Sequence, residues 1–352
     1  MSIIELARPD IRALQPYSSA RTEASGGSVL LNANESPWPA GERALNRYPD
    51  PQPAELVARL AALYGVAPAQ LLVGRGSDEA IDLLVRAFCR ADRDAILICP
   101  PTFGMYAVSA AVQGAAVVEA PLRADFSLDV DALLERVTPA VKLVFVCTPN
   151  NPTGNLVPLA AVERLAAALA GRALVVVDEA YIEFAGVASA MTLLDRFDNL
   201  VVLRTLSKAH ALAAARIGSL IAHADIVALL RRILPAYPLP SPCVDAALAA
   251  LTPAALVATR ARVAALAEAR DRLAAILRRA PGVREVYPSV ANFVLARCSA
   301  ATTVYRRLLG AGVVVRDVSR HPALGDCLRV SAGSDTDHSA LEAALIPHEV
   351  TS

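Results

Sequence analysis

Two stretches of the sequence decide the fold: Ala173-Leu-Val-Val-Val-Asp-Glu-Ala-Tyr181 and Leu200-Val-Val-Leu-Arg-Thr-Leu-Ser-Lys208. Each begins as a short, β-branched and apolar run, which is typical of a strand covered by helices on both faces. Each then ends in polar residues, and a third run, Val141–Cys147, leads into Thr-Pro-Asn-Asn-Pro-Thr-Gly154. Open α/β sheets bind ligands outside the carboxyl ends of their strands. An acid, a lysine and an amide at these three ends therefore predict a ligand site.

The pattern continues on both sides of these stretches, where apolar runs alternate with amphipathic ones. Further strands are predicted at Ala95–Cys99, Ala115–Ala120 and Ile217–Ala222. Helices are predicted between them, for example at Pro53–Tyr64, Ser77–Arg90 and Pro158–Ala170. Alternating strands and helices predict an α/β fold, with a mostly parallel central sheet flanked by helices and connected by right-handed crossovers.

A second, smaller α+β domain is predicted after the proline-rich segment 235–242, because proline cannot continue a helix. A long helix is expected over Ala254–Arg279, followed by one more helix and several strands. Their predicted bounds are Val283–Tyr287, Asn292–Ala296, Ala301–Leu309 (helix), Val313–Arg316 and Leu328–Ser331. The first 40 residues, rich in Ser, Gly and Pro, are expected to form an arm. The predicted division is an arm over 1–40 that joins the small domain, a large domain over 41–240 and a small domain over 241–352.

Composition argues against several classes of partner. The 34 basic and 34 acidic side chains balance, so the chain has no net field that would attract nucleic acid or an anionic membrane. Charges interrupt every apolar stretch before the roughly 18 residues that a membrane span needs. The first ten residues carry Glu5 and Asp10 and lack the basic-then-apolar pattern of a signal peptide. We therefore expect a cytoplasmic protein without nucleic acid or membrane partners.

The cysteines and histidines do not form a metal-binding pattern. Six cysteines are scattered without CxxC spacing, and the five histidines also lack the spacing of metal ligands. Most cysteines stand in apolar surroundings, where a reduced cysteine acts as a small buried hydrophobe. No metal site is predicted.

The ordered polar motifs resemble those of the fold-type I pyridoxal-phosphate enzymes and, within them, the histidinol-phosphate aminotransferases. The motifs are Asn150-Asn-Pro-Thr-Gly154, Asp178-Glu-Ala-Tyr181, and Ser207-Lys208 followed by Arg216. The resemblance covers nearly the whole chain, from Leu14-Gln-Pro-Tyr17 to Leu328-Arg-Val-Ser331. It implies pyridoxal 5'-phosphate as the cofactor and a homodimer with shared active sites.

Two residues are candidates for the central chemistry. Lys208 follows a buried strand, and partial desolvation there would favour its neutral amine, which can attack the cofactor aldehyde and carry protons. Asp178 would keep the cofactor's ring nitrogen protonated. The alternatives are a surface lysine and an aspartate that caps a helix, although the chain has very few lysines.

The remaining cofactor contacts are implied by the resemblance. Tyr181 and Asn151 would hydrogen-bond the phenolic oxygen of the cofactor, and Phe103 would stack on its ring, although Phe103 could equally belong to the core. The phosphate would lie at a helix start, which without a ligand also reads as an ordinary capped helix. Its implied contacts are Gly76, Ser77, Asp78, Ser207 and Arg216, with Tyr48 from the other subunit.

The segment between Lys208 and Arg216 departs from the family pattern. Ala214 and Ala215 stand where the family usually has glycines before the arginine, and alanine restricts φ. The loop is therefore expected to differ slightly there. His210 stands where an aromatic or apolar residue is common, and we interpret it as a packing residue.

Substrate binding is predicted from arginines on apolar strands. Arg316 follows Val313-Val-Val315, and Arg329 lies within Cys327-Leu-Arg-Val330. A buried unpaired charge is costly, so a guanidinium in such a strand indicates an anionic ligand or an internal salt bridge. The resemblance adds Tyr17 and Asn34 as substrate-binding residues.

The predicted reaction is transfer of the amino group between L-histidinol phosphate and 2-oxoglutarate in histidine biosynthesis, with small-molecule amino donor and 2-oxo acid as partners. Two alternatives share the cofactor motifs: an aromatic amino-acid aminotransferase and a decarboxylase of a phosphorylated amino acid. A third is a non-catalytic ligand sensor with this fold. Such sensors normally carry an added DNA-binding domain, for which this chain has neither the length nor a basic recognition helix.

Overall fold

The computed structural model describes residues 2–16 and 29–346, so Tyr17 lies outside the described residues. Within the described residues, seven strands form a central sheet in the order β1-β7-β6-β5-β4-β2-β3. Strands β2 to β6 run parallel to one another, whereas β7 runs antiparallel to both β6 and β1. Their bounds are β1 Leu71–Gly74, β2 Ala95–Ile98, β3 Ala116–Glu119, β4 Val141–Cys147, β5 Leu174–Asp178, β6 Leu200–Thr205 and β7 Gly218–Ala222. The predicted mostly parallel α/β sheet is confirmed.

The six strands predicted in this part of the chain are all present, with bounds that differ by at most one residue. Strand β1 was not predicted. It is four residues long and fully buried, and it lies at the edge of the sheet beside β7. So short an apolar run cannot be told from a buried helix segment by its pattern.

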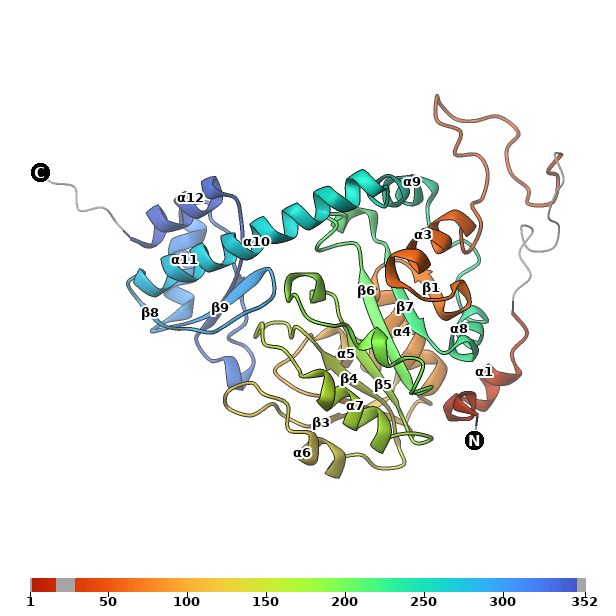
Figure 1. The fold of residues 1–352 in the computed structure, drawn as a ribbon, viewed down its shortest axis with the longest axis horizontal. Coiled ribbons are helices and arrows are strands. Elements are labelled where there is room, and N and C mark those ends of the chain that lie inside the picture. Colours follow the sequence, from red (N-terminus) through yellow and green to blue (C-terminus); the bar gives the residue numbers. More distant parts are fainter. Residues whose placement is uncertain (1, 17–28, 347–352) are drawn as a thin grey trace, which may run out of the picture.

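Helices cover both faces of the central sheet (Figure 1). Alternate residues of a strand point to opposite faces: Val175 and Val177 of β5 pack with α3, α6, α7 and α9, while Leu174 and Val176 pack with α4, α5 and α8. The helices are α3 Ala54–Tyr64, α4 Ser77–Phe88, α5 Met105–Gln113, α6 Val130–Glu135, α7 Leu159–Ala168, α8 Ala224–Arg231 and α9 Ser241–Ala250. This double cover is why the predicted strands read as almost wholly apolar.

The first described residues, 2–16, contain two short helices. A short 3-10 helix, Ile3–Leu6, and the helix α1, Pro9–Ala13, lie beside the large domain. Ile3 and Ala7 are buried in the same core cluster as residues of α4 and α8. The composition of the first 40 residues did not reveal this, because Ile3 and Ala7 are the only buried residues within 2–16.

The 27-residue helix α10, Pro253–Arg279, runs from the large domain to the small one (Figure 1). The small domain holds an antiparallel sheet in the order β10-β11-β9-β8, and its helices α11 and α12 pack on it. The bounds are β8 Val283–Val286, β9 Phe293–Cys298, α11 Ala301–Gly310, β10 Arg316–Asp317, β11 Cys327–Ser331 and α12 Asp335–Leu345. Helix α9 follows the predicted division at residue 240 but contributes Val244 and Ala247 to the core of the large sheet. The division itself stays a prediction.

The predicted strand Val313–Arg316 is wrong in its bounds, because only Arg316–Asp317 pairs with β11. The amide of Val313 donates to the Leu308 carbonyl at the end of α11, and this bond holds the valines outside the sheet. Helix α12 was not predicted, although Ser334 and Asp337 form a capping box at its start.

No single helix in the described part of the chain is long and apolar enough to cross a membrane. The adjacent helices α9 and α10 pass such a test only as a pair, and they are bent by 76° relative to each other. Groups of three or more His, Cys, Asp or Glu side chains that could hold a metal ion are absent from residues 2–16 and 29–346.

Candidate active site

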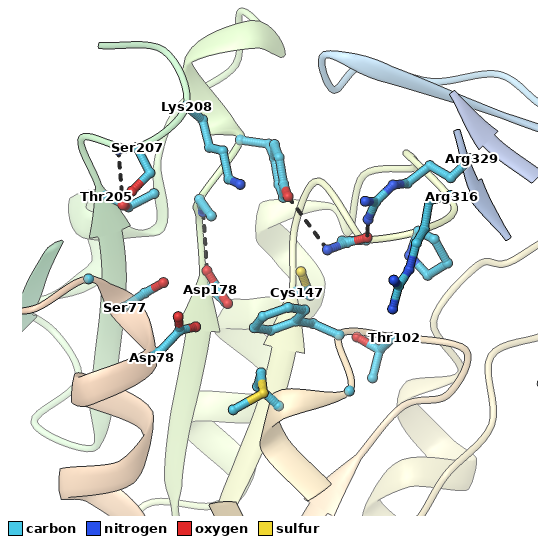
Figure 2. Close-up of a pocket in the computed structure, with 18 of the residues that line it drawn as sticks. Ser77, Asp78, Thr102, Cys147, Asp178, Thr205, Ser207, Lys208, Arg316 and Arg329 are labelled. Carbon is cyan, nitrogen blue, oxygen red and sulfur yellow. Dashed lines mark hydrogen bonds between the residues drawn. The ribbon is translucent and has the colours of Figure 1, made fainter. Parts of the chain in front are cut away.

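A cavity of about 600 Å³ lies at the carboxyl ends of β4, β5 and β6, where the sequence predicted a ligand site (Figure 2). It brings together most of the predicted site residues from both domains. The predicted residues that line it are Gly76, Ser77, Asp78, Phe103, Asn151, Asp178, Tyr181, Ser207, Lys208, Arg216, Arg316 and Arg329.

Asp178 lies at the base of the cavity, at the last position of β5, with an exposed fraction of 2%. Its carboxylate accepts hydrogen bonds from the Tyr106 hydroxyl (2.7 Å) and the Ala180 amide (3.2 Å). Burial raises the pKa of Asp178 to about 6, against the lowering effect of both hydrogen bonds. The site thus holds a buried carboxylate that a cationic ligand group would stabilise.

Lys208 enters the cavity from the loop after β6, and Figure 2 shows its amine above Asp178. Partial burial lowers the pKa of Lys208, and the nearby positive charges of Arg329 and Arg216 lower it further. The amine also lies 5.6 Å from the centroid of the Tyr181 ring. The carboxylates of Asp78 and Asp178 act in the opposite direction, but the pKa is lowered on balance, which favours the neutral, nucleophilic amine.

Asn151 joins the large domain to the small one across the cavity. Its amide nitrogen lies 3.5 Å from the Tyr181 hydroxyl, and its amide oxygen accepts a hydrogen bond from Arg329 on β11. Tyr181 in turn packs edge-to-face on Phe293 of β9, with ring centroids 5.2 Å apart. The side chains of Asn151 and Tyr181 are therefore held on the same side of the cavity as Arg329.

The start of α4 forms a cradle on the other side, where Gly76 is the N-cap residue with φ 84° and Ser77 is the first helical residue. The first amide groups of a helix have no partners within it and favour an anion. Ser207 also lines the cavity, and its hydroxyl is buried with no hydrogen-bond partner within the described residues. An unsatisfied buried hydroxyl beside a helix start fits the phosphate group of a ligand.

Arg216 completes this cradle, and its guanidinium donates to the Asp78 carboxylate at 3.1 Å. Ala213–Ala215 form a short 3-10 helix before Arg216, and the expected difference from the family's loop stays a prediction. Positive φ values fall on Arg216 (55°) and Ala211 (57°). His210 is buried, in accord with its interpretation as a packing residue.

Arg316 and Arg329 face each other in the pairing of β10 with β11, and both reach the cavity from the small domain (Figure 2). Burial and the charge of Arg316 lower the pKa of Arg329, but the ordinary value of a guanidinium is so high that it stays charged. Neither arginine has a carboxylate partner in the described part of the chain. The alternative of an internal salt bridge is therefore not realised there, and two cations face one cavity.

Two of the predicted residues lie away from this cavity. Tyr48 is 49% exposed and stacks on Tyr237, with ring centroids 4.3 Å apart. Asn34 is exposed and has a φ of 54°. Neither lines the cavity of its own chain.

Several residues of the site were not predicted. Tyr106 of α5 bonds Asp178 from below, while Cys147, Thr102 and Thr205 line the cavity. Thr102 donates to the Asn150 amide oxygen at 2.8 Å and so holds the loop that carries Asn151. A single aromatic or hydroxyl residue in an apolar segment gives no sequence signal of such a role.

Comparison with known proteins identifies the family. The profile of the family described as aminotransferase class I and II matches residues 29–345. The histidinol-phosphate aminotransferase of Stenotrophomonas maltophilia is 54% identical over 97% of this chain and 96% of its own length. The enzyme of the same name from Xanthomonas axonopodis is 53% identical over 98% of this chain and 97% of its own.

A solved structure agrees with this result. The crystal structure of histidinol-phosphate aminotransferase from Sinorhizobium meliloti in complex with pyridoxal-5'-phosphate has a TM-score of 0.78 and 30% identity, covering 85% of this chain and 82% of its own. The buried Asp178 carboxylate, the Lys208 amine and the unsatisfied Ser207 hydroxyl fit such a cofactor. The chain therefore belongs to the pyridoxal-phosphate-dependent class I and II aminotransferases, in their histidinol-phosphate aminotransferase group.

Proposed function

We propose that this chain transfers the amino group of L-histidinol phosphate to 2-oxoglutarate, giving imidazole-acetol phosphate and glutamate, as a step of histidine biosynthesis. The observation that carries the proposal is the half-buried Arg329, which faces the cavity without a carboxylate partner in the described residues. The relatives that share more than half of this sequence bear the name of that reaction.

We assign the cofactor contacts to residues around the cavity. Lys208 would bind the cofactor aldehyde, and Asp178 would hold the ring nitrogen in its protonated form. Asn151 and Tyr181 would bind the phenolic oxygen, and Phe103 would pack on the ring. The phosphate contacts would be Gly76, Ser77, Asp78, Ser207 and Arg216. When bound, the cofactor supplies an electron sink for the carbon that bears the amino group.

The chain's own part in the reaction is to hold and move protons at fixed atoms. The neutral amine of Lys208 can accept the proton from the substrate carbon and would then deliver it to the cofactor carbon, and the lowered pKa supports this role. Asp178 lies at the base of the cavity, and the hydrogen bonds from Tyr106 and Ala180 favour its anionic form, which would hold a proton on the ring nitrogen of the cofactor. Side chains of both domains line the site.

Arg329 and Arg316 would bind the anionic end of each substrate. A guanidinium binds a phosphate or a carboxylate through paired hydrogen bonds. Histidinol phosphate offers the first of these groups and glutamate the second. One arginine site can serve both, because the two substrates of a ping-pong reaction never occupy it together.

The proposal includes an assembly and a location. We propose a homodimer in which Tyr48 binds the cofactor phosphate of the neighbouring subunit, while Tyr17 and Asn34 contact substrate. The exposure of Tyr48 outside its own cavity supports this assignment. We also propose that the enzyme acts in the cytoplasm. Its balanced charges support the absence of nucleic acid and membrane partners.

The test is to measure kcat/KM of the purified enzyme for histidinol phosphate, phenylalanine and tyrosine at a fixed concentration of 2-oxoglutarate. Histidinol phosphate should give the highest value. If phenylalanine or tyrosine gives the higher kcat/KM, the proposed substrate is wrong, although the aminotransferase activity stands. Release of CO2 from O-phosphothreonine would instead indicate the decarboxylase. If glutamate leaves the visible spectrum of the holoenzyme unchanged, the chain would instead be a non-catalytic ligand sensor with this fold.

A further inference from the structure

Tyr106 lies beneath the cavity, with its ring completely buried and its hydroxyl 2.7 Å from the Asp178 carboxylate. The ring stacks on Phe145 of β4, with centroids 4.6 Å apart and planes 14° apart. Phe103 packs edge-to-face on the same ring, with ring centroids 5.6 Å apart. Because rings confine Tyr106 on two sides, its hydroxyl can take few other positions.

Asp178 depends on this hydroxyl more than an exposed aspartate would. Its side-chain hydrogen bonds within the described residues are those from Tyr106 and from the Ala180 amide, which reach different oxygens. Removing one donor from a buried anion costs more than the same loss at the surface. The hydroxyl itself stays protonated, since burial and the charge of Asp178 raise the pKa of Tyr106 well above its ordinary value.

We propose that Tyr106 is a positioning residue that acts through Asp178: its hydroxyl fixes one carboxylate oxygen and stabilises the anion opposite the cofactor's ring nitrogen. This inference rests on the proposed cofactor role of Asp178, and it adds a residue that does not touch the substrate arginines. The charged and titratable groups that face Asp178 are Tyr106 on α5, Cys147 on β4, Asp78 on α4, Tyr181 after β5 and Lys208 after β6.

The first experiment measures the affinity of the apoenzyme for pyridoxal phosphate from about pH 5.5 to 8.5. This range includes the raised pKa of Asp178, about 6, and extends above it. Tyr106→Phe keeps the ring but removes the hydrogen-bond donor, so the pKa of Asp178 should rise. As the pH falls, the carboxylate should then become protonated at a higher pH than in the wild type. We expect affinity about tenfold weaker near neutral pH, and weaker still in acid, as for a lost hydrogen bond to a charged group. An unchanged pH profile would overturn the proposal.

Turnover of the holoenzyme adds a second readout. Tyr106→Phe should lower kcat, while KM for histidinol phosphate stays within about twofold, because Tyr106 does not contact the proposed substrate arginines. Tyr305→Phe is the matched control, since Tyr305 packs against the core of the small domain. It should leave both affinity and turnover unchanged. An equal loss in kcat for both variants would assign the effect to general packing.

A double-mutant cycle separates positioning from packing. Once Asp178→Ala has removed the acceptor, adding Tyr106→Phe should cost no further pyridoxal-phosphate affinity. A second loss as large as the first would show that Tyr106 acts independently of Asp178 and would refute the inference. These affinities are measured without an amino substrate, so they stand even if histidinol phosphate proves not to be the substrate.

Discussion

Gly218 on β7 packs directly against the backbone of Gly76: a Cβ atom on Gly218 would lie 2.3 Å from the Gly76 carbonyl carbon and 2.5 Å from the Ser77 nitrogen. Both neighbouring atoms belong to the main chain at the start of α4, so neither can move away by rotation of a side chain. The first residue of β7 therefore limits where this helix can begin, and with it the proposed phosphate cradle. Only glycine at position 218 allows so close an approach.

Gly218→Ala should accordingly displace the start of α4 and weaken pyridoxal-phosphate binding. Overpacking of this kind costs about 1–3 kcal/mol, or about 5- to 150-fold if all of it falls on cofactor affinity. The measurement is fluorescence titration of the apoenzyme, with thermal unfolding in parallel. Gly310→Ala is the control, since a Cβ atom at Gly310 meets nothing within 4 Å. Wild-type affinity in Gly218→Ala would show that the cradle does not depend on this contact.

Lys208→Ala should abolish transamination and leave the fold intact. The chain contains just one other lysine, Lys142, whose amine donates to the Pro139 carbonyl on the exposed surface. Borohydride reduction of the holoenzyme followed by peptide mass spectrometry should place the cofactor label on Lys208 and none on Lys142. Lys142→Ala should retain full activity. Label on Lys142, or turnover by Lys208→Ala above a small residue, would refute the assignment.

Arg329→Ala should weaken both half-reactions, because the same guanidinium would bind the phosphate of one substrate and the carboxylate of the other. Losing one charge-assisted contact in the transition state costs about 2–4 kcal/mol, which is about 30- to 1000-fold in kcat/KM. Single-turnover kinetics with histidinol phosphate and with glutamate give the two values separately. Arg320→Ala, a change at an exposed position nearby, serves as the control. A loss confined to one half-reaction would mean that the anions bind at different sites.

The proposed shared active site predicts complementation between two impaired variants. Lys208→Ala and Tyr48→Phe should each be impaired, and random mixing of subunits should restore about a quarter of the wild-type sites through heterodimers. Tyr48→Phe preserves the ring that stacks on Tyr237, so the change tests the hydroxyl alone. Sedimentation at the assay concentration supplies the second measurement. A monomer there, or no recovery of activity on mixing, would contradict the shared site.

The chemistry of the strand ends could be predicted from the sequence. Val141–Cys147, Ala173–Val177 and Leu200–Arg204 are so uniformly apolar that their identity as covered strands follows from composition, and the polar residues after them then share one sheet edge. The position of Lys208 and Asp178 at this edge follows from the sequence pattern alone. Their motifs also sufficed to indicate the family, since the order and spacing of motifs are properties of the chain alone.

Other contacts were decided by the tertiary structure alone. Tyr106 meets Asp178 across 72 residues of sequence, and Arg329 meets Asn151 across 178. The close approach of Gly218 to Gly76, and the burial of Ile3 in the large core, likewise depend on segments distant in the chain. Periodicity reports which side of its own helix or strand a residue occupies. It carries no information about which distant side chain packs against that side, because that choice is made by the packing of all the elements together.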